Sequence, residues 1–203
     1  MEQTLWEKYP LLNTMNKLRK SRFNASERLD RRYKWNSLAL VIFSIYALAL
    51  GFIPKYFPAA VTSSTDIIGF SSVVSSVFVV ALSVYSAFSE DIIRSKYLHD
   101  NAKMVTSVYH EYKLIIDNHE GKGGDKPDDL KFQSRYQTII DGCQYNHDQI
   151  DFQSISGDLE KLNKSQKTWI WIQINFSIYF WPALAIIGPL VLLLIAFQLR
   201  LPR

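Results

Sequence analysis

The residues of this chain that could bind a metal or act as a nucleophile are few. There is one cysteine, Cys143, and the four histidines lie at scattered positions, namely His99, His110, His119 and His147. A zinc site needs three or four such ligands at short spacings, and a single thiol cannot form an internal disulfide. The sequence therefore predicts no metal, no cofactor and no dependence on an oxidising compartment.

One short segment gathers polar groups, YNHDQIDF at residues 145–152. His147, Asp148 and Asp151 lie close together in it, but no nucleophile joins them. We interpret Asn146 and His147 as residues that cap or pin helix ends through hydrogen bonds. The glycine-rich stretch at 121–129 follows no predicted strand and lacks the Walker pattern, so it is not expected to bind phosphate. The chain is not expected to be an enzyme.

A second group of polar residues lies inside an apolar segment. Residues 67–88 contain no charged residue but six serines. At about 100° per residue, five of them fall on one side of a helix: Ser72, Ser75, Ser76, Ser83 and Ser86. Small hydroxyl residues in a membrane helix either let helices pack closely or line a wet lumen after oligomerisation. In an oligomer, Glu90 and Asp91 could form an acidic ring that favours cations, or they could be ordinary helix-end charges.

Two apolar runs are long enough to cross a bilayer. The first, residues 35–53, has nineteen residues and no charge, which at helical rise is roughly 28 Å, close to the hydrocarbon thickness of about 30 Å. The second is the serine-containing run, residues 67–88. The short linker between them, residues 54–66, predicts a turn and hence an antiparallel transmembrane hairpin.

A third apolar run, which lies in the C-terminal membrane segment of residues 169–203, departs from this pattern. Its 31 residues from Trp169 to Leu199 carry no charge, which is too long for one perpendicular span and too short for two. We expect Pro182 and Pro189 to break it, with an interfacial or tilted aromatic part followed by a spanning core from residue 182. A re-entrant or monotopic segment is the alternative.

The charged residues predict the topology. Residues 1–34 carry nine Lys/Arg and four acids, the 54–66 linker carries one Lys, and residues 89–168 carry eleven Lys/Arg and fourteen acids. The positive-inside rule places both long segments in the cytosol. Seven basic residues are expected at the membrane surface, in contact with anionic lipid: Arg19, Lys20, Arg22, Arg28, Arg31, Arg32 and Lys34. A nucleic-acid or nucleotide-phosphate site is the sharper alternative, although direct binding of nucleic acid is not expected.

The cytosolic segments read as helices. Residues 14–34 predict a basic amphipathic helix, and residues 67–118, which lack proline and contain glycine only at Gly69, predict one continuous helix of about 78 Å. Its cytosolic apolar stripe is expected to be Ile93, Tyr97, Met104, Val108, Tyr112 and Ile115. A further helix is expected at residues 129–143. The fold class is therefore an all-α membrane protein: a transmembrane hairpin, a cytosolic helical bundle and a C-terminal apolar helix.

The order of these elements resembles a known family. A basic helix ending RLDRRYKWNSLAL, a hairpin, a long helix beginning FSEDIIRSKYLHDNAKMV and the segment SRYQTIIDGCQYNHDQIDF are similar to the SLATT family of bacterial two-transmembrane proteins. The most specific part is Tyr136, Asn146, His147 and Asp151, which resembles the motif of a subfamily associated with reverse-transcriptase and antiphage operons. The resemblance covers roughly residues 15–155, and the third apolar run departs from a minimal two-helix member.

The resemblance implies a function that composition does not. SLATT proteins are thought to be effectors that assemble and perforate the bacterial inner membrane when infection is sensed. By this resemblance the chain would be a homo-oligomer in contact with membrane lipids, regulated by a nucleotide second messenger or by a reverse transcriptase or nucleotide synthase encoded nearby. The motif residues would be structural pins. A non-conducting scaffold or sensor for a partner enzyme remains the alternative.

Overall fold

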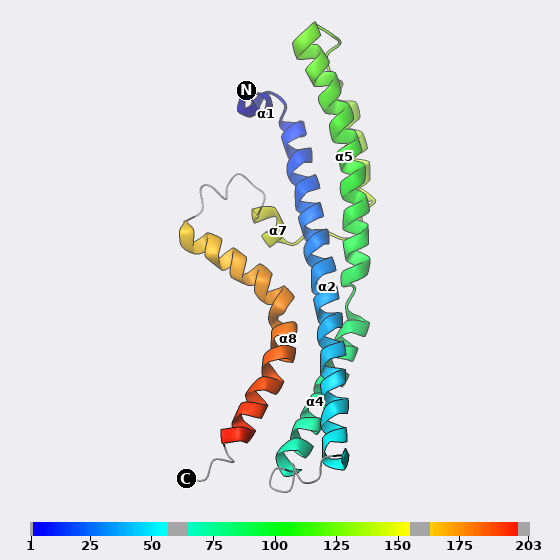
Figure 1. Cartoon of the computed structure of the whole chain (residues 1–203). Coiled ribbons are helices and arrows are strands. Elements are labelled where there is room, and N and C mark those ends of the chain that lie inside the picture. The colour runs from blue at the N-terminus through cyan, green and yellow to red at the C-terminus, as the bar shows by residue number, and fades with distance from the viewer. Residues whose placement is uncertain (1, 57–64, 155–162, 199–203) are drawn as a thin grey trace. The chain divides into compact units, whose positions relative to one another are not determined.

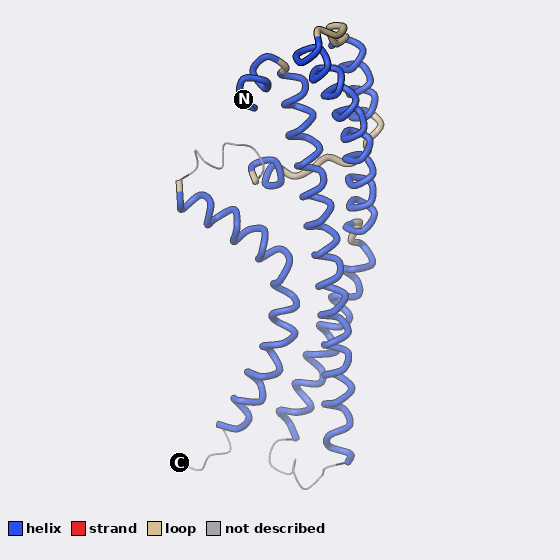
Figure 2. The backbone as a smooth tube through the Cα atoms, turned by 45° about the horizontal axis from the view of Figure 1, so that its top comes forward, coloured by secondary structure: helices blue, strands red, loops and turns tan. Residues whose placement is uncertain are grey.

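A computed structural model describes residues 2–56, 65–154 and 163–198. Regular structure in these ranges is helical throughout, with no strand (Figure 2). The helices are α1 (Glu2–Lys8), α2 (Pro10–Tyr56), α4 (Thr65–Phe88), α5 (Asp91–Lys122), α6 (Asp129–Asp141), α7 (Gln149–Gln153) and α8 (Lys164–Gln198). The prediction of an all-α membrane protein is confirmed.

The chain forms two compact units. One, the polar unit, comprises residues 1–30 and 91–174, and the other, the apolar unit, comprises residues 31–90 and 175–203. Helix α2 belongs to both, because it continues without a break from the basic N-terminal segment through the first apolar run (Figure 1).

The core of the polar unit lies between α2, α5 and α6. Leu12 and Met15 of α2 pack against Val105 and Tyr112 of α5, and all four are almost fully buried. Phe132 of α6 closes this core, with its ring centroid 4.8 Å from that of Tyr112. These side chains recur every three or four residues, which is why amphipathic helices pair here.

Helix α6 begins where the sequence places it. The Asp128 side chain accepts a hydrogen bond from the backbone N–H of Lys131 at 3.1 Å, as an N-cap does. The Tyr112 hydroxyl donates to Asp129 at 2.5 Å, and Asn101 Nδ2 donates to the carbonyl of Ile139 at 2.7 Å. These bonds fix α6 on α5. Burial, and then the bond to Asp129, raise the pKa of Tyr112 above its ordinary range.

The apolar unit packs three helices together. Ala39 and Phe43 of α2, Leu82 of α4 and Ala185 of α8 form its buried cluster. The rings of Phe43 and Phe78 stack with centroids 5.3 Å apart. Two stretches are long and apolar enough to cross a membrane, one within Pro10–Phe52 and one within Ile68–Lys122. In each of them only 17% of the apolar segment is buried. Such long apolar helices with mostly exposed surface are suited to lipid rather than to a soluble core.

Two sequence predictions about helix continuity are wrong. Pro182 and Pro189 lie inside the single helix α8 and do not end it, because neighbouring helices and local adjustment can compensate for the missing N–H in an apolar helix. The predicted helix over residues 67–118 is interrupted, since Ser89 and Glu90 are not helical and α5 begins at Asp91. Serine and acidic side chains bond to nearby backbone groups and so favour helix starts.

The predicted stripe of α5 is also partly wrong. Ile93, Tyr97 and Met104 are about half exposed. The buried stripe keeps Val108 and Tyr112 but otherwise consists of residues outside the predicted stripe, three of them polar. Its members are Asp91, Ser95, Leu98, Asn101, Ala102, Val105, Val108, Tyr109, Tyr112 and Ile116. The central part of the predicted 54–66 turn, residues 57–64, lies outside the described residues.

Candidate functional site

The Asp151 motif residue binds an arginine of the N-terminal helix. Arg28 Nε donates to Asp151 Oδ1 and Arg28 Nη2 donates to Asp151 Oδ2, each at 2.9 Å. The Arg28 side chain is 9% exposed and that of Asp151 is 2% exposed. Arg28 Nη2 also donates to Asp148 at 2.5 Å, but the Asp148 side chain is half exposed. This two-pronged, buried ion pair attaches α7 to α2.

The residues before α7 form the structured start of that helix. Asp148 and Asp151 make a capping box, in which the Asp148 backbone N–H donates to Asp151 Oδ2 at 3.3 Å. The Asn146 side chain accepts from the backbone N–H of His147 at 2.9 Å. Arg94 of α5 donates to the carbonyl of Asn146 at 3.4 Å. The N-cap of α7 is therefore Asp148, and the role of Asn146 and His147 as residues that cap or pin helix ends stays a prediction.

The other two motif residues, Tyr136 and His147, lie near Arg22 of α2. Burial raises the pKa of Tyr136 above its ordinary value, and the charge of Arg22 opposes that shift. Burial, and then the charge of Arg22, lower the pKa of His147 below its ordinary value. The imidazole is therefore neutral at neutral pH. The motif thus faces two arginines of one helix, Arg22 and Arg28.

The sequence did not predict that these two arginines are buried partners of the motif. It places Arg22 and Arg28 at the membrane surface, whereas their residues are 2% and 8% exposed. Both arginines are buried because they belong to a stripe of α2 with three- and four-residue spacings, which also contains Ser21, Ala25 and Leu29. Desolvation lowers the pKa of Arg22. For Arg28, desolvation acts in the same direction, but the Asp151 and Asp148 carboxylates outweigh it and raise the pKa.

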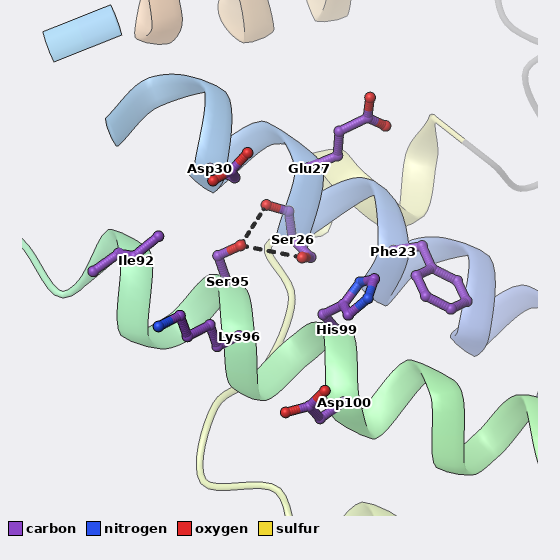
Figure 3. Close-up of a pocket in the computed structure, with 9 residues that line it drawn as sticks. All are labelled: Phe23, Ser26, Glu27, Asp30, Ile92, Ser95, Lys96, His99 and Asp100. Atoms are coloured by element: carbon purple, nitrogen blue, oxygen red, sulfur yellow. Dashed lines mark hydrogen bonds between the residues drawn. The ribbon is translucent and has the colours of Figure 1, made fainter. Parts of the chain in front are cut away.

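A groove of about 460 Å³ lies between α2 and α5 (Figure 3). Its floor is a pair of buried serines, in which the Ser95 hydroxyl donates to the Ser26 carbonyl at 2.8 Å. Its remaining lining is Phe23, Glu27, Asp30, Ile92, Lys96, His99 and Asp100. Three carboxylates against one lysine do not favour a phosphate-bearing ligand in this groove.

The serines of α4 do not share one environment. Ser76 and Ser83 are exposed, Ser72 and Ser86 are partly exposed, and Ser75 is 5% exposed inside the apolar unit. At about 100° per residue, Ser72, Ser76 and Ser83 lie within about 40° of one another. Ser75 packs inward instead, so it is not available to line a lumen in this arrangement.

The exposed hydroxyls bond to their own helix. The Ser76 hydroxyl donates to the Ser72 carbonyl at 2.9 Å, and the Ser83 hydroxyl donates to the Val79 carbonyl at 2.7 Å. Glu90 is exposed just beyond the end of α4. Within the described residues, no three His, Cys, Asp or Glu side chains are grouped as metal ligands would be.

The fold and these sites define a class of protein: an all-α membrane protein with an apolar helical hairpin and a polar helical unit. Residues 7–195 match the family described as SMODS and SLOG-associating 2TM effector domain family 5, and the chain belongs to this family of two-transmembrane effector domains. The resemblance to the SLATT family is therefore confirmed, and the match includes most of α8. No curated protein and no solved structure matches the chain.

Proposed function

We propose that this membrane effector acts in a bacterial antiphage defence system by assembling into a homo-oligomeric pore. The proposal places it in the inner membrane as a multi-pass protein with the N-terminus in the cytosol. Nine Lys/Arg in residues 1–34, against one in residues 54–66, support that orientation. Loss of the membrane potential would then arrest or kill the infected cell.

The observation that carries the proposal is the two-sided exposed surface of α4. Val73, Val77 and Val84 are more than half exposed and suit a lipid environment. Ser76 and Ser83 are exposed on a neighbouring face, together with the partly exposed Ser72. A helix surrounded only by lipid gains nothing from a hydroxyl face. A helix that borders both lipid and a wet lumen needs one apolar face and one hydroxyl face.

The polar unit is the proposed receiver of the activating signal. The family description names association with SMODS and SLOG domains, and on that basis the proposed regulator is a nucleotide second messenger or a partner enzyme encoded nearby. Helix α2 offers a direct mechanical route, because the helix that carries Arg22 and Arg28 continues without a break into the first apolar run.

The experiment is to measure the inner-membrane potential of bacteria while the chain is induced, alone and with its operon partners during phage challenge. Depolarisation before lysis is expected for the natural sequence. It should be lost in the double variant Ser76→Leu, Ser83→Leu at equal membrane abundance. The matched control is Val77→Leu, which adds bulk to the valine face and should still depolarise. A membrane that stays polarised with the natural chain inserted would refute the pore.

A second candidate function is a non-conducting scaffold or sensor for a partner enzyme. The hydrogen bonds from Ser76 and Ser83 to carbonyls of their own helix favour it, because hydroxyls satisfied in this way need no water. In that case the serine face packs against other helices. The membrane then stays sealed at every expression level, while partner activity requires the membrane-bound chain.

A further inference from the structure

Arg22 is a buried charge for which the described residues provide no complete set of acceptors. The residue is 2% exposed. Its Nε and Nη1 atoms are both buried, and neither has a hydrogen-bond acceptor in the described part of the chain. Desolvation lowers its pKa, yet an arginine stays protonated in proteins. A buried cation without a counter-charge is strongly destabilising.

Arg28, six residues further along the same helix, shows the opposite arrangement. Its guanidinium is held by the carboxylates of Asp151 and Asp148. The ionisable groups that interact with the charge of Arg22 are instead the Cys143 thiol and the Tyr136 hydroxyl. Cys143 Sγ donates to the carbonyl of Tyr145 at 3.1 Å.

Further unpartnered polar atoms belong to the same region. His147 Nδ1 is buried without a partner in the described residues. Burial, and then the charge of Arg22, lower the pKa of this imidazole, while the Asp151 and Asp148 carboxylates oppose that shift. Ser21, the neighbour of Arg22, also has a buried Oγ without a partner among them. A guanidinium, a phenol and an imidazole, with no carboxylate bound to the guanidinium, are the donor set of an anion site.

We propose that Arg22, Tyr136 and His147 form a binding site for a small inorganic anion, chloride or phosphate, which supplies the counter-charge of Arg22. The near-complete burial of Arg22 excludes a bulky ligand, whereas the neighbouring His147 and Cys143 are partly exposed. The site lies within the polar unit and joins α2, α6 and the loop before α7. It is independent of the pore, so either proposal can fail without the other.

The test uses the full chain purified in detergent. Thermal unfolding is followed by circular dichroism at constant ionic strength, while gluconate is replaced stepwise by chloride or, in a second series, by phosphate. The melting temperature is expected to rise with a saturating dependence on one of these anions, as specific binding to the folded state requires. The two series identify which anion binds.

Three variants locate the effect. Arg22→Met keeps the apolar stem without the charge and should abolish the anion dependence. Lys103→Met removes an exposed cation of the same unit and should leave the dependence unchanged. Tyr136→Phe keeps the ring in the core and should raise the half-saturating anion concentration by about tenfold or more.

Two results overturn the proposal. One is a natural chain whose melting temperature does not depend on either anion. The other is a dependence that Arg22→Met retains, which would show that anions act elsewhere on the surface. If Arg22→Met does not fold, Tyr136→Phe decides the question, because an unchanged half-saturating concentration in that variant also overturns the site.

Discussion

Replacing Asp151 by asparagine should release α7 from α2. The change keeps the size of the side chain and its capacity to accept from the Asp148 backbone N–H, but it removes the charge that faces Arg28. Arg28 and Asp151 expose 9% and 2% of their side chains, and loss of one partner of such a buried pair costs roughly 3–5 kcal/mol. The half-exposed Asp148 compensates in part, so we expect about 3 kcal/mol.

The assay is hydrogen–deuterium exchange of the full chain in detergent, read by mass spectrometry on a peptide that contains α7. A cost of about 3 kcal/mol corresponds to a loss of protection of roughly a hundredfold, or to complete loss if the native protection is smaller.

The matched control is Asp148→Asn. It is the same chemical change three residues earlier, asparagine is an equally good N-cap, and the side chain is half exposed. A solvent-exposed pair contributes up to about 1 kcal/mol, so protection should fall by about fivefold at most. Equal losses in the two variants, or a loss below threefold for Asp151→Asn, would show that the buried pair does not hold α7.

Three further predictions concern the polar unit. Burial and Arg22 lower the pKa of His147, so the imidazole of the unfolded chain binds a proton at higher pH than that of the folded chain. The stability of the folded chain should therefore fall as pH drops from about 6.5 towards the lowered pKa. His147→Asn should reduce that fall in melting curves. Tyr112→Phe removes the bond to Asp129 and should lower the opening free energy of α6 in hydrogen exchange by about 1–2 kcal/mol. Leu98 is fully buried in a cluster with Ala25 and Leu29, so Leu98→Ala should destabilise the chain by about 2–5 kcal/mol in thermal unfolding. Leu114→Ala, at a residue that is 62% exposed, should stay within about 0.5 kcal/mol.

The apolar helices could be predicted from the sequence because a membrane span is a one-dimensional property. Residues 35–53 and 67–88 carry no charge over the length of a bilayer, and both lie inside long helices. The continuity of α8 could not be predicted in the same way. Proline breaks helices in water, and the packing of Trp181 and Leu184 in the apolar unit is not visible in the local sequence.

The arginine sites show a different limit. Arg22 and Arg28 lie among seven basic residues, and the membrane-surface interpretation applies to all seven equally. Their burial depends on which stripe of α2 faces α5, α6 and α7. That orientation is set by residues distant in the sequence, such as Asp151, which lies more than a hundred residues from Arg28. The buried face of α5 could not be predicted for the same reason, because it includes the polar residues Ser95 and Asn101.

The central claim, that the exposed serine face of α4 lines a pore, is tested most directly by cysteine accessibility. Single cysteines at Ser76, Ser83 and Val77 are introduced in a Cys143→Ser background, and ion currents are recorded from reconstituted membranes before and after a charged, water-soluble thiol reagent. The reagent is expected to reduce the current of Ser76→Cys and Ser83→Cys and to leave that of Val77→Cys unchanged. Currents that respond equally at all three positions, or at Val77→Cys alone, would contradict it.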